Sequence, residues 1–82
     1  MKQLMRFDIV SRSDPQALIR LLNHFAQRSL LPSHVAATEE AGRLKVRIDQ
    51  PDVEEKQANI IAERMRNSVL VETVRIERGA AS

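Results

Sequence analysis

The order of strand-like and helix-like periodicities along the sequence is the feature that most limits how this chain can fold. Four runs read as strands, the second only weakly because alanine favours strands poorly, and two runs repeat apolar residues at helical spacing. The expected strands cover residues 3–10, 33–38, 43–49 and 69–77, and the expected helices cover residues 15–28 and 53–67. This βαββαβ order predicts an α+β fold with one four-stranded antiparallel sheet in the order 4-1-3-2 and both helices on one face.

The apolar positions within these runs predict a single small core. Its expected members are Met5, Phe7, Ile9, Leu18, Leu21, Leu22, Phe25, Leu44, Val46, Ile48, Ile61, Met65, Val74 and Ile76. The 82 residues include two phenylalanines and no tryptophan or tyrosine, although aromatic side chains bury the largest area per residue. Such a core leaves a short chain with a thin stability margin, which favours self-association.

The boundary between the first strand and the first helix carries a strong local signal. Asp14 suits the N-cap, because its carboxylate can accept a hydrogen bond from a first-turn N–H group, and Pro15 suits the first helical position. The turn therefore brings unpaired N–H groups and the positive end of a helix dipole to the edge of a sheet, where an anion or carboxylate can bind. The alternative is that Asp14 itself occupies those donors and the turn is only a helix cap.

Other boundaries are marked by glycine, proline and acidic residues. Gly42 suits a positive φ and predicts a hairpin turn over residues 39–42. Gln50-Pro51 is expected to end the third strand. Asp52, with Glu55 three residues later, is expected to begin the second helix as an acidic capping box.

No catalytic or metal-binding constellation stands out in the sequence. The chain has no cysteine, which excludes disulfides, thiolate nucleophiles and zinc–thiolate sites. His24 and His34 are the only imidazoles, and neither has a ligand-type residue at metal-binding spacing. Gly42 and Gly79 are the only glycines, so there is no glycine-rich phosphate loop. We therefore expect a protein that is not an enzyme and that holds no metal or cofactor.

Charge and hydropathy limit the partners and the cellular location that we expect for this chain. The net charge is +2, from 13 Lys and Arg against 11 Asp and Glu, which is too balanced to demand a nucleic-acid partner. The N-terminus has no long apolar run, so neither a signal peptide nor a membrane span is expected and a cytoplasmic location is the default. We expect one domain over residues 1–78 and a flexible tail over residues 79–82.

The outward positions of the strands predict a charged open sheet face. Its expected members are Arg6, Asp8, Arg43, Lys45, Arg47, Asp49, Arg75 and Glu77. Two interpretations stay open, phosphate or RNA binding across the sheet and a solvated face of cross-strand ion pairs. The second is favoured, because both signs of charge are interleaved and no aromatic side chain is expected there to stack on bases.

Three features give the chain a resemblance to a known family. They are Asp14-Pro15 between the first strand and the first helix, the βαββαβ spacing, and the stretch Val69-Leu70-Val71-Glu72-Thr73-Val74-Arg75-Ile76. Together they resemble the ACT domain, a ferredoxin-like regulatory module of amino-acid metabolism. Over residues 3–77 the chain is most similar to short small (regulatory) subunits of acetolactate synthase, an enzyme of branched-chain amino-acid biosynthesis.

The resemblance implies a non-catalytic regulatory or assembly subunit. Its implied partners are a second copy, joined side by side through the second strand, and the catalytic large subunit of acetolactate synthase, a thiamine-diphosphate enzyme. An amino acid would bind between the first turn of one copy and the second strand of the other. The implied ligand-binding residues are Arg12, Ser13, Asp14, Pro15, Gln16, Ala17, Ser33, His34, Val35 and Ala36.

Two positions depart from the family pattern. Gln16 stands where many ligand-binding members have glycine, and its long side chain is expected to crowd the ligand, so we expect weak or no amino-acid binding. Ser29 stands where glycine often ends the first helix.

Two other functions stay open: a stand-alone ACT homo-oligomer that senses an amino acid, and a nucleic-acid-binding module on the same fold.

Overall fold

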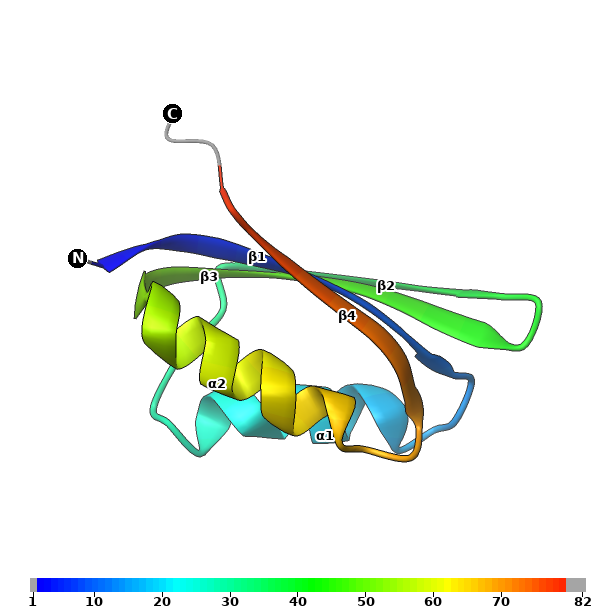
Figure 1. Cartoon of the computed structure of the whole chain (residues 1–82). Coiled ribbons are helices and arrows are strands. Elements are labelled where there is room, and N and C mark those ends of the chain that lie inside the picture. Colours follow the sequence, from blue (N-terminus) through cyan, green and yellow to red (C-terminus); the bar gives the residue numbers. More distant parts are fainter. Residues whose placement is uncertain (1, 80–82) are drawn as a thin grey trace.

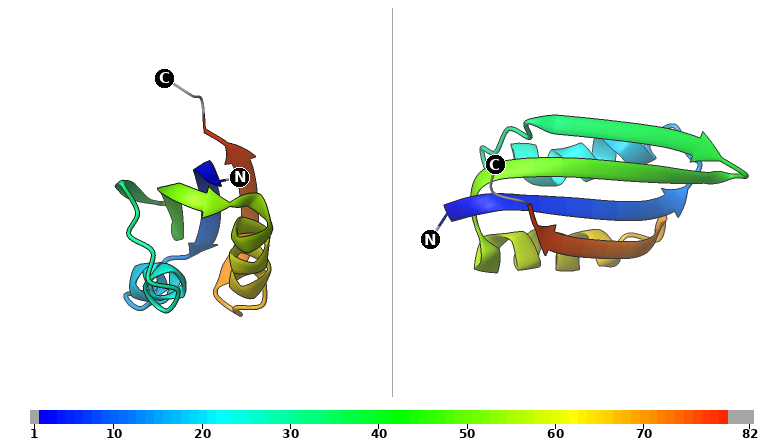
Figure 2. Two further views of the ribbon diagram at one scale, coloured as in Figure 1. Left: turned by 90° about the vertical axis from the view of Figure 1, so that its left-hand side faces the viewer. Right: turned by 90° about the horizontal axis from the view of Figure 1, so that it is seen from above.

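The computed structural model describes residues 2–79 and has the expected βαββαβ order (Figure 1). The elements are β1 (Lys2–Arg12), α1 (Ala17–Ala26), β2 (His34–Glu40), β3 (Arg43–Glu54), α2 (Glu55–Arg66) and β4 (Val71–Arg78). Neighbouring strands are antiparallel and their order is β2-β3-β1-β4, which is the predicted order 4-1-3-2 read from the other edge. Both helices lie under one face of the sheet and the other face is open (Figure 2). The predicted α+β, ferredoxin-like fold is confirmed.

The core lies between the sheet and the helices. Phe7 and Phe25 are fully buried and form an edge-to-face pair, with ring centroids 5.1 Å apart and an interplanar angle of 89°. Most of the predicted core residues are buried, and four are only partly buried against the core, namely Leu18, Leu22, Leu44 and Ile76. The predicted set missed Ala17, Val53, Ala58 and Ala62. Three of these are alanines, whose small side chains let a helix approach its neighbours closely.

A two-residue turn, Ala41-Gly42, joins β2 to β3. Both residues have positive φ, 52° and 78°, and the flanking residues Glu40 and Arg43 face each other. This is the pattern of a type I′ turn, whose twist matches that of two antiparallel strands. The hairpin predicted at Gly42 is confirmed, and Ala41 adopts the left-handed conformation without being glycine.

β3 continues through Pro51 to Glu54, so the prediction that Gln50-Pro51 ends this strand is wrong. Gln3–Met5 of β1 lie opposite Gln50–Val53 of β3, which gives β3 one extra residue over this interval. The extra residue forms a β-bulge, a place where a sheet tolerates a proline because the ladder is already interrupted. The φ of Asp52 within the bulge is +54°.

The bulge also explains why the predicted start of the second helix is wrong. Asp52 lies in the bulge rather than at an N-cap, and α2 begins at Glu55. Its N-cap residue is Glu54, which makes no side-chain cap hydrogen bond. Val53, expected in the helix, is the last residue but one of β3, and its side chain is fully buried.

α1 is shorter at both ends than predicted, because a capping turn flanks it on each side. At its C-terminal end Ser29 has a φ of 57°. The Ser29 N–H donates to the Ala26 carbonyl at 3.0 Å, and the Leu30 N–H donates to the Phe25 carbonyl at 2.9 Å. This pair of bonds is the Schellman motif, with Ser29 in the place that glycine usually takes.

β4 remains paired with β1 up to the last described residue. The Gly79 N–H donates to the Leu4 carbonyl at 2.8 Å, so Gly79 extends the pairing of β4 rather than starting a free tail. The other positions of the expected tail, residues 80–82, lie outside the described residues, and the domain limits of 1–78 stay a prediction.

Candidate functional site

The turn between β1 and α1 is fastened to its neighbours by backbone hydrogen bonds. The Arg12 N–H donates to the Leu70 carbonyl at 2.8 Å, and the Ser13 N–H donates to the Gly42 carbonyl at 3.0 Å. The turn is therefore held against the β2–β3 hairpin on one side and the segment before β4 on the other.

Asp14 occupies donors at the start of α1. Its Oδ1 accepts from the Gln16 N–H at 2.7 Å, and its backbone carbonyl accepts from the Ala17 N–H at 3.0 Å. The regular helix begins at Ala17 rather than at Pro15, yet Asp14 still caps the turn that leads into it. These two bonds take up donors that would otherwise face a ligand.

The side chains of the turn differ in what they offer to a ligand. Arg12, Ser13, Pro15 and Gln16 are exposed and Asp14 is half-buried. Ala17 is 2% exposed and belongs to the core, so its side chain serves packing. Gln16 therefore presents its amide at the surface of the turn.

Residues 33–36, the other predicted part of the site, lie at the start of β2. Ser33 is held by Asp49, whose carbonyl accepts from the Ser33 N–H at 2.9 Å and from its Oγ at 3.3 Å. His34, Val35 and Ala36 are exposed. Within residues 2–79, β2 pairs with β3 alone, which leaves its other edge open.

One chain does not bring the two predicted parts of the site together. β2 starts at His34 beside Asp49 and ends at Glu40 beside the hairpin turn that holds Ser13. Its seven residues span about 20 Å. The β1–α1 turn and residues 33–36 therefore lie at opposite ends of the sheet.

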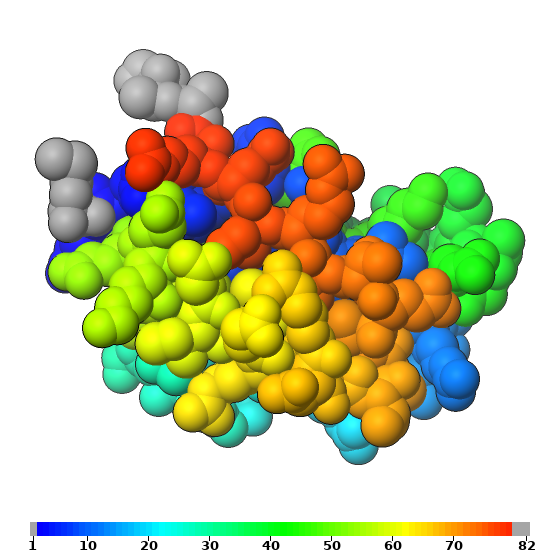
Figure 3. All heavy atoms as spheres, in the orientation of Figure 1, coloured from blue at the N-terminus to red at the C-terminus, as the bar shows by residue number. Residues whose placement is uncertain are grey.

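β2 is an unusually bare edge strand. All seven of its residues are exposed, and the hairpin tip projects past the helices (Figures 1 and 3). Its central residues Val35, Ala36 and Ala37 carry no charge that would discourage pairing with another strand.

The flank of α1 adds apolar surface on the same side of the molecule. α1 lies on the β2 side of the sheet and α2 on the β4 side (Figure 2). Ile19 is 65% exposed, and Leu18 and Leu22 are half-buried. At 100° per residue these three side chains lie on the side of α1 away from Arg20 and His24. A strand edge and an apolar helix flank together form a surface suited to a protein partner.

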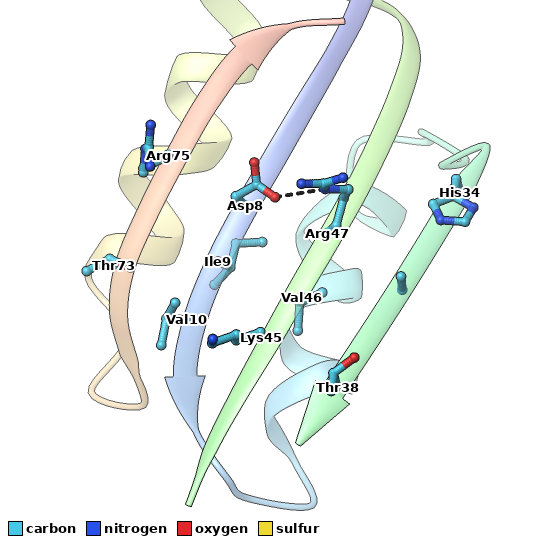
Figure 4. Close-up of a pocket in the computed structure, with 11 residues that line it drawn as sticks. Asp8, Ile9, Val10, His34, Thr38, Lys45, Val46, Arg47, Thr73 and Arg75 are labelled. Carbon is cyan, nitrogen blue, oxygen red and sulfur yellow. Dashed lines mark hydrogen bonds and ion pairs between the residues drawn. The ribbon is translucent and has the colours of Figure 1, made fainter. Parts of the chain in front are cut away.

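The open sheet face has a shallow groove of about 510 Å³ (Figure 4). Its floor is made of small side chains, including those of Val10, Ala36 and Thr73, and its charged residues are Asp8, Lys45, Arg47 and Arg75. Asp8 lies opposite Arg47 on one side and Arg75 on the other. The groove is therefore basic overall, with an acid at its centre.

Ion pairs across the strands account for much of this charge. Arg47 Nε lies 3.0 Å from Asp8 Oδ1, as Figure 4 shows, and Arg6 Nε lies 2.9 Å from Asp49 Oδ1. The hydrogen bond and the charge of Asp49 raise the pKa of Arg6. Cross-strand ion pairs, the interpretation favoured from the sequence, engage most of the predicted residues of this face, whereas Arg75 and Glu77 join none of the ion pairs formed within residues 2–79.

The described part of the chain holds neither a metal-binding cluster nor a membrane-spanning helix. Among residues 2–79 there is no group of three or more His, Asp or Glu side chains placed to hold a metal ion. None of the helices formed by these residues is long and apolar enough to cross a membrane.

The fold and the open edge define a class of protein: a small βαββαβ module with a bare outer strand and no metal-binding cluster among residues 2–79. The model of the ACT-like domain family matches residues 1–82. The chain therefore belongs to the ACT-like domain family, whose members are typically regulatory rather than catalytic. A search of curated protein sequences gave no match.

Solved structures agree on the fold at low sequence identity. The ACT domain of GTP pyrophosphokinase from Chlorobium tepidum has a TM-score of 0.81 at 10% identity, over 94% of this chain and all of that one. Homoserine dehydrogenase from Thiobacillus denitrificans has a TM-score of 0.81 at 13% identity, over 95% of this chain and 17% of that enzyme. The C-terminal domain of MgtC from Mycobacterium tuberculosis has a TM-score of 0.76 at 13% identity, over 95% of this chain and 88% of that domain. These names do not single out acetolactate synthase.

Proposed function

We propose that this chain is a non-catalytic regulatory subunit that works as a side-by-side dimer joined through β2. The observation that carries the proposal is the bare edge of β2, with three uncharged residues at its centre and the apolar flank of α1 beside it. Two such edges can pair in antiparallel fashion and complete each other's backbone hydrogen bonds.

A two-fold axis near Ala37 would assemble a ligand site from two chains. Antiparallel pairing about that point sets the partner's His34 against Glu40, at the sheet end where Gly42 holds the turn. The partner's residues 33–36 would then lie next to the β1–α1 turn, although they are about 20 Å away within one chain. This arrangement supports an amino acid as the ligand, bound between the turn and the partner's strand.

The side chain of Gln16 is expected to lower the affinity of that site for an amino acid. Its side chain is exposed on the turn, and Asp14 already accepts from the Gln16 N–H. The negative charge of Asp14 would oppose a ligand carboxylate, although it could attract a ligand amino group. We therefore expect weak or no amino-acid binding by the natural sequence. We propose the large subunit of acetolactate synthase as its partner and the cytoplasm as its location.

Dimerisation is tested by changing two exposed valines to glutamate. Val35→Glu places a carboxylate on the open edge, where the proposed pairing about Ala37 sets it against the partner's Glu39, whereas Val69→Glu changes a residue that is 87% exposed in the segment before β4. Sedimentation should show a species near twice the chain mass for the natural protein and for Val69→Glu, and a monomer for Val35→Glu. A natural protein that stays monomeric at high concentration would contradict the dimer.

The ligand and the enzyme partner need separate measurements. Calorimetric titration with valine, leucine and isoleucine should show little heat for the natural protein and clear binding for Gln16→Gly, if Gln16 is what fills the site. Addition of the chain to an isolated acetolactate synthase large subunit should raise its activity. No change in that activity would remove this partner and would leave the stand-alone sensor as the favoured function.

A further inference from the structure

The helical layer carries a cleft whose chemistry differs from that of the open sheet face. His24, Gln27 and Arg28 from α1 and the turn after it, with Arg64 of α2, line a cleft of about 250 Å³. Its side chains are arginines, an imidazole and an amide, and no carboxylate of residues 2–79 lines it. The open face, in contrast, holds Asp8 among its basic groups.

The nearby carboxylates of α2 are engaged elsewhere. Glu63 pairs with Arg66 at 2.6 Å and Glu55 pairs with Arg78 at 3.0 Å. Arg28 and Arg64 take part in none of the ion pairs formed within residues 2–79. No ion pair within these residues therefore neutralises the two arginines, although Glu55 and Glu63 line a separate hollow beside Arg64.

The pKa of His24 reflects this positive charge. Burial lowers the pKa of its imidazole, and the positive charges of Arg64 and Arg28 lower the pKa further. Arg20, one turn earlier on α1, adds a third positive charge on the same side. The other residues that line the hollow beside His24, from β1 and from residues 68–71, carry no charge. Within residues 2–79, none of the side chains that line the two hollows beside His24 carries a negative charge that would favour its protonated form.

We propose that this cleft binds a dianionic oxyanion, such as a phosphate group of a small phosphorylated molecule or sulfate. Arg28 and Arg64 would supply forked N–H donors, Gln27 a neutral donor, and His24 a further donor once protonated. The cleft belongs to the helical layer, so it is distinct from the amino-acid site proposed at the sheet end, and it does not depend on that proposal.

Sulfate is a suitable probe, because it stays a dianion over the pH range in which histidine titrates. NMR titration of the two histidines gives the test, with sulfate and chloride compared at equal ionic strength. Sulfate should raise the pKa of His24 by about one unit if the protonated form binds it tenfold more tightly. The imidazole resonances of His34, on β2 and outside the cleft, should show no difference between the two salts. Equal His24 pKa values in the two salts, or an equal shift of His34, would overturn the proposal.

Two variants identify the donors. Arg28→Gln and Arg64→Gln should each abolish most of the sulfate-dependent shift, whereas Arg43→Gln, at a sheet residue paired with Glu72, should leave it intact. The alternative is that these cations only stabilise the C-terminal ends of the two helices. In that case the variants would lower the melting temperature while sulfate and chloride acted alike. The comparison of His24 with His34 in the natural protein distinguishes sulfate binding from helix stabilisation even if a variant fails to fold.

Discussion

Replacement of Ser29 by glycine should stabilise the protein, because Ser29 closes α1 in a left-handed conformation. Its φ is 57°, and it takes the glycine position of a Schellman motif whose two hydrogen bonds are 3.0 and 2.9 Å long. The left-handed region costs an L-residue about 1–2 kcal/mol relative to the right-handed one. Glycine avoids this cost but adds about 0.5–1 kcal/mol of chain entropy in the unfolded state.

The difference between the two effects is a gain of roughly 0–1.5 kcal/mol for Ser29→Gly, or about 0.75 kcal/mol at the midpoints of the two ranges. In a domain of this size about 1 kcal/mol shifts the melting temperature by roughly 4–8 °C. Thermal unfolding followed by circular dichroism, with calorimetry to confirm two-state behaviour, resolves such a shift.

Two control variants separate backbone conformation from other effects of the substitution. Ser29→Ala removes the same hydroxyl without relieving the left-handed strain, so it should not raise the melting temperature. Ala26→Gly introduces glycine at an exposed helical position three residues earlier and should destabilise by about 0.5–1 kcal/mol. If Ser29→Gly melts at or below the natural protein, the assignment of Ser29 to a strained cap is wrong.

Three further changes test the turn, the core and the helical layer. Ala41→Asn should raise stability to urea, because asparagine followed by Gly42 is the preferred pair of a type I′ turn. Phe25→Ala should destabilise by about 3–5 kcal/mol, since it removes a fully buried ring in edge-to-face contact with Phe7, and an unchanged melting temperature would contradict this packing. The free energy of unfolding should fall as the pH drops below about 6.5, because the pKa of His24 is lower in the folded state and the unfolded chain binds more protons. It should level off below the folded-state pKa of His24, and His24→Gln should remove this component.

Much of the fold could be predicted, because the spacing at which apolar residues recur indicates which side chains are buried. Phe7 and Phe25 were predicted in the core from two different periods, and both are fully buried. The region around Pro51 could not be predicted, because proline followed by an aspartate reads as a strand end and a helix cap. A β-bulge accepts the proline without ending the strand, and its presence depends on how β1 pairs with β3. Long-range pairing of this kind leaves no signal in the local sequence.

The two segments of the candidate site could be predicted from the sequence, but their relative position could not. Asp14 before Pro15 indicates a capped turn, and the structure bears this out in the bond from the Gln16 N–H. The cleft around His24 was not predicted, because Arg28 in the turn after α1 and Arg64 in α2 are far apart in the sequence. The only local signal was the spacing of four between His24 and Arg28.

The proposed amino-acid site is divided between two chains, so regulation through it would depend on assembly. The β1–α1 turn and residues 33–36 lie about 20 Å apart in one chain, so a monomer offers a ligand only half of the proposed contacts. A ligand that bridges two chains binds the dimer better than the monomer, and by linkage it must stabilise the dimer by the same free energy. Gln16→Gly should therefore make dimer affinity depend on the amino acid, whereas the natural sequence should dimerise equally well with and without it. An amino-acid-dependent shift in the sedimentation of the natural protein would show that Gln16 does not block the site and that this chain senses its ligand through assembly.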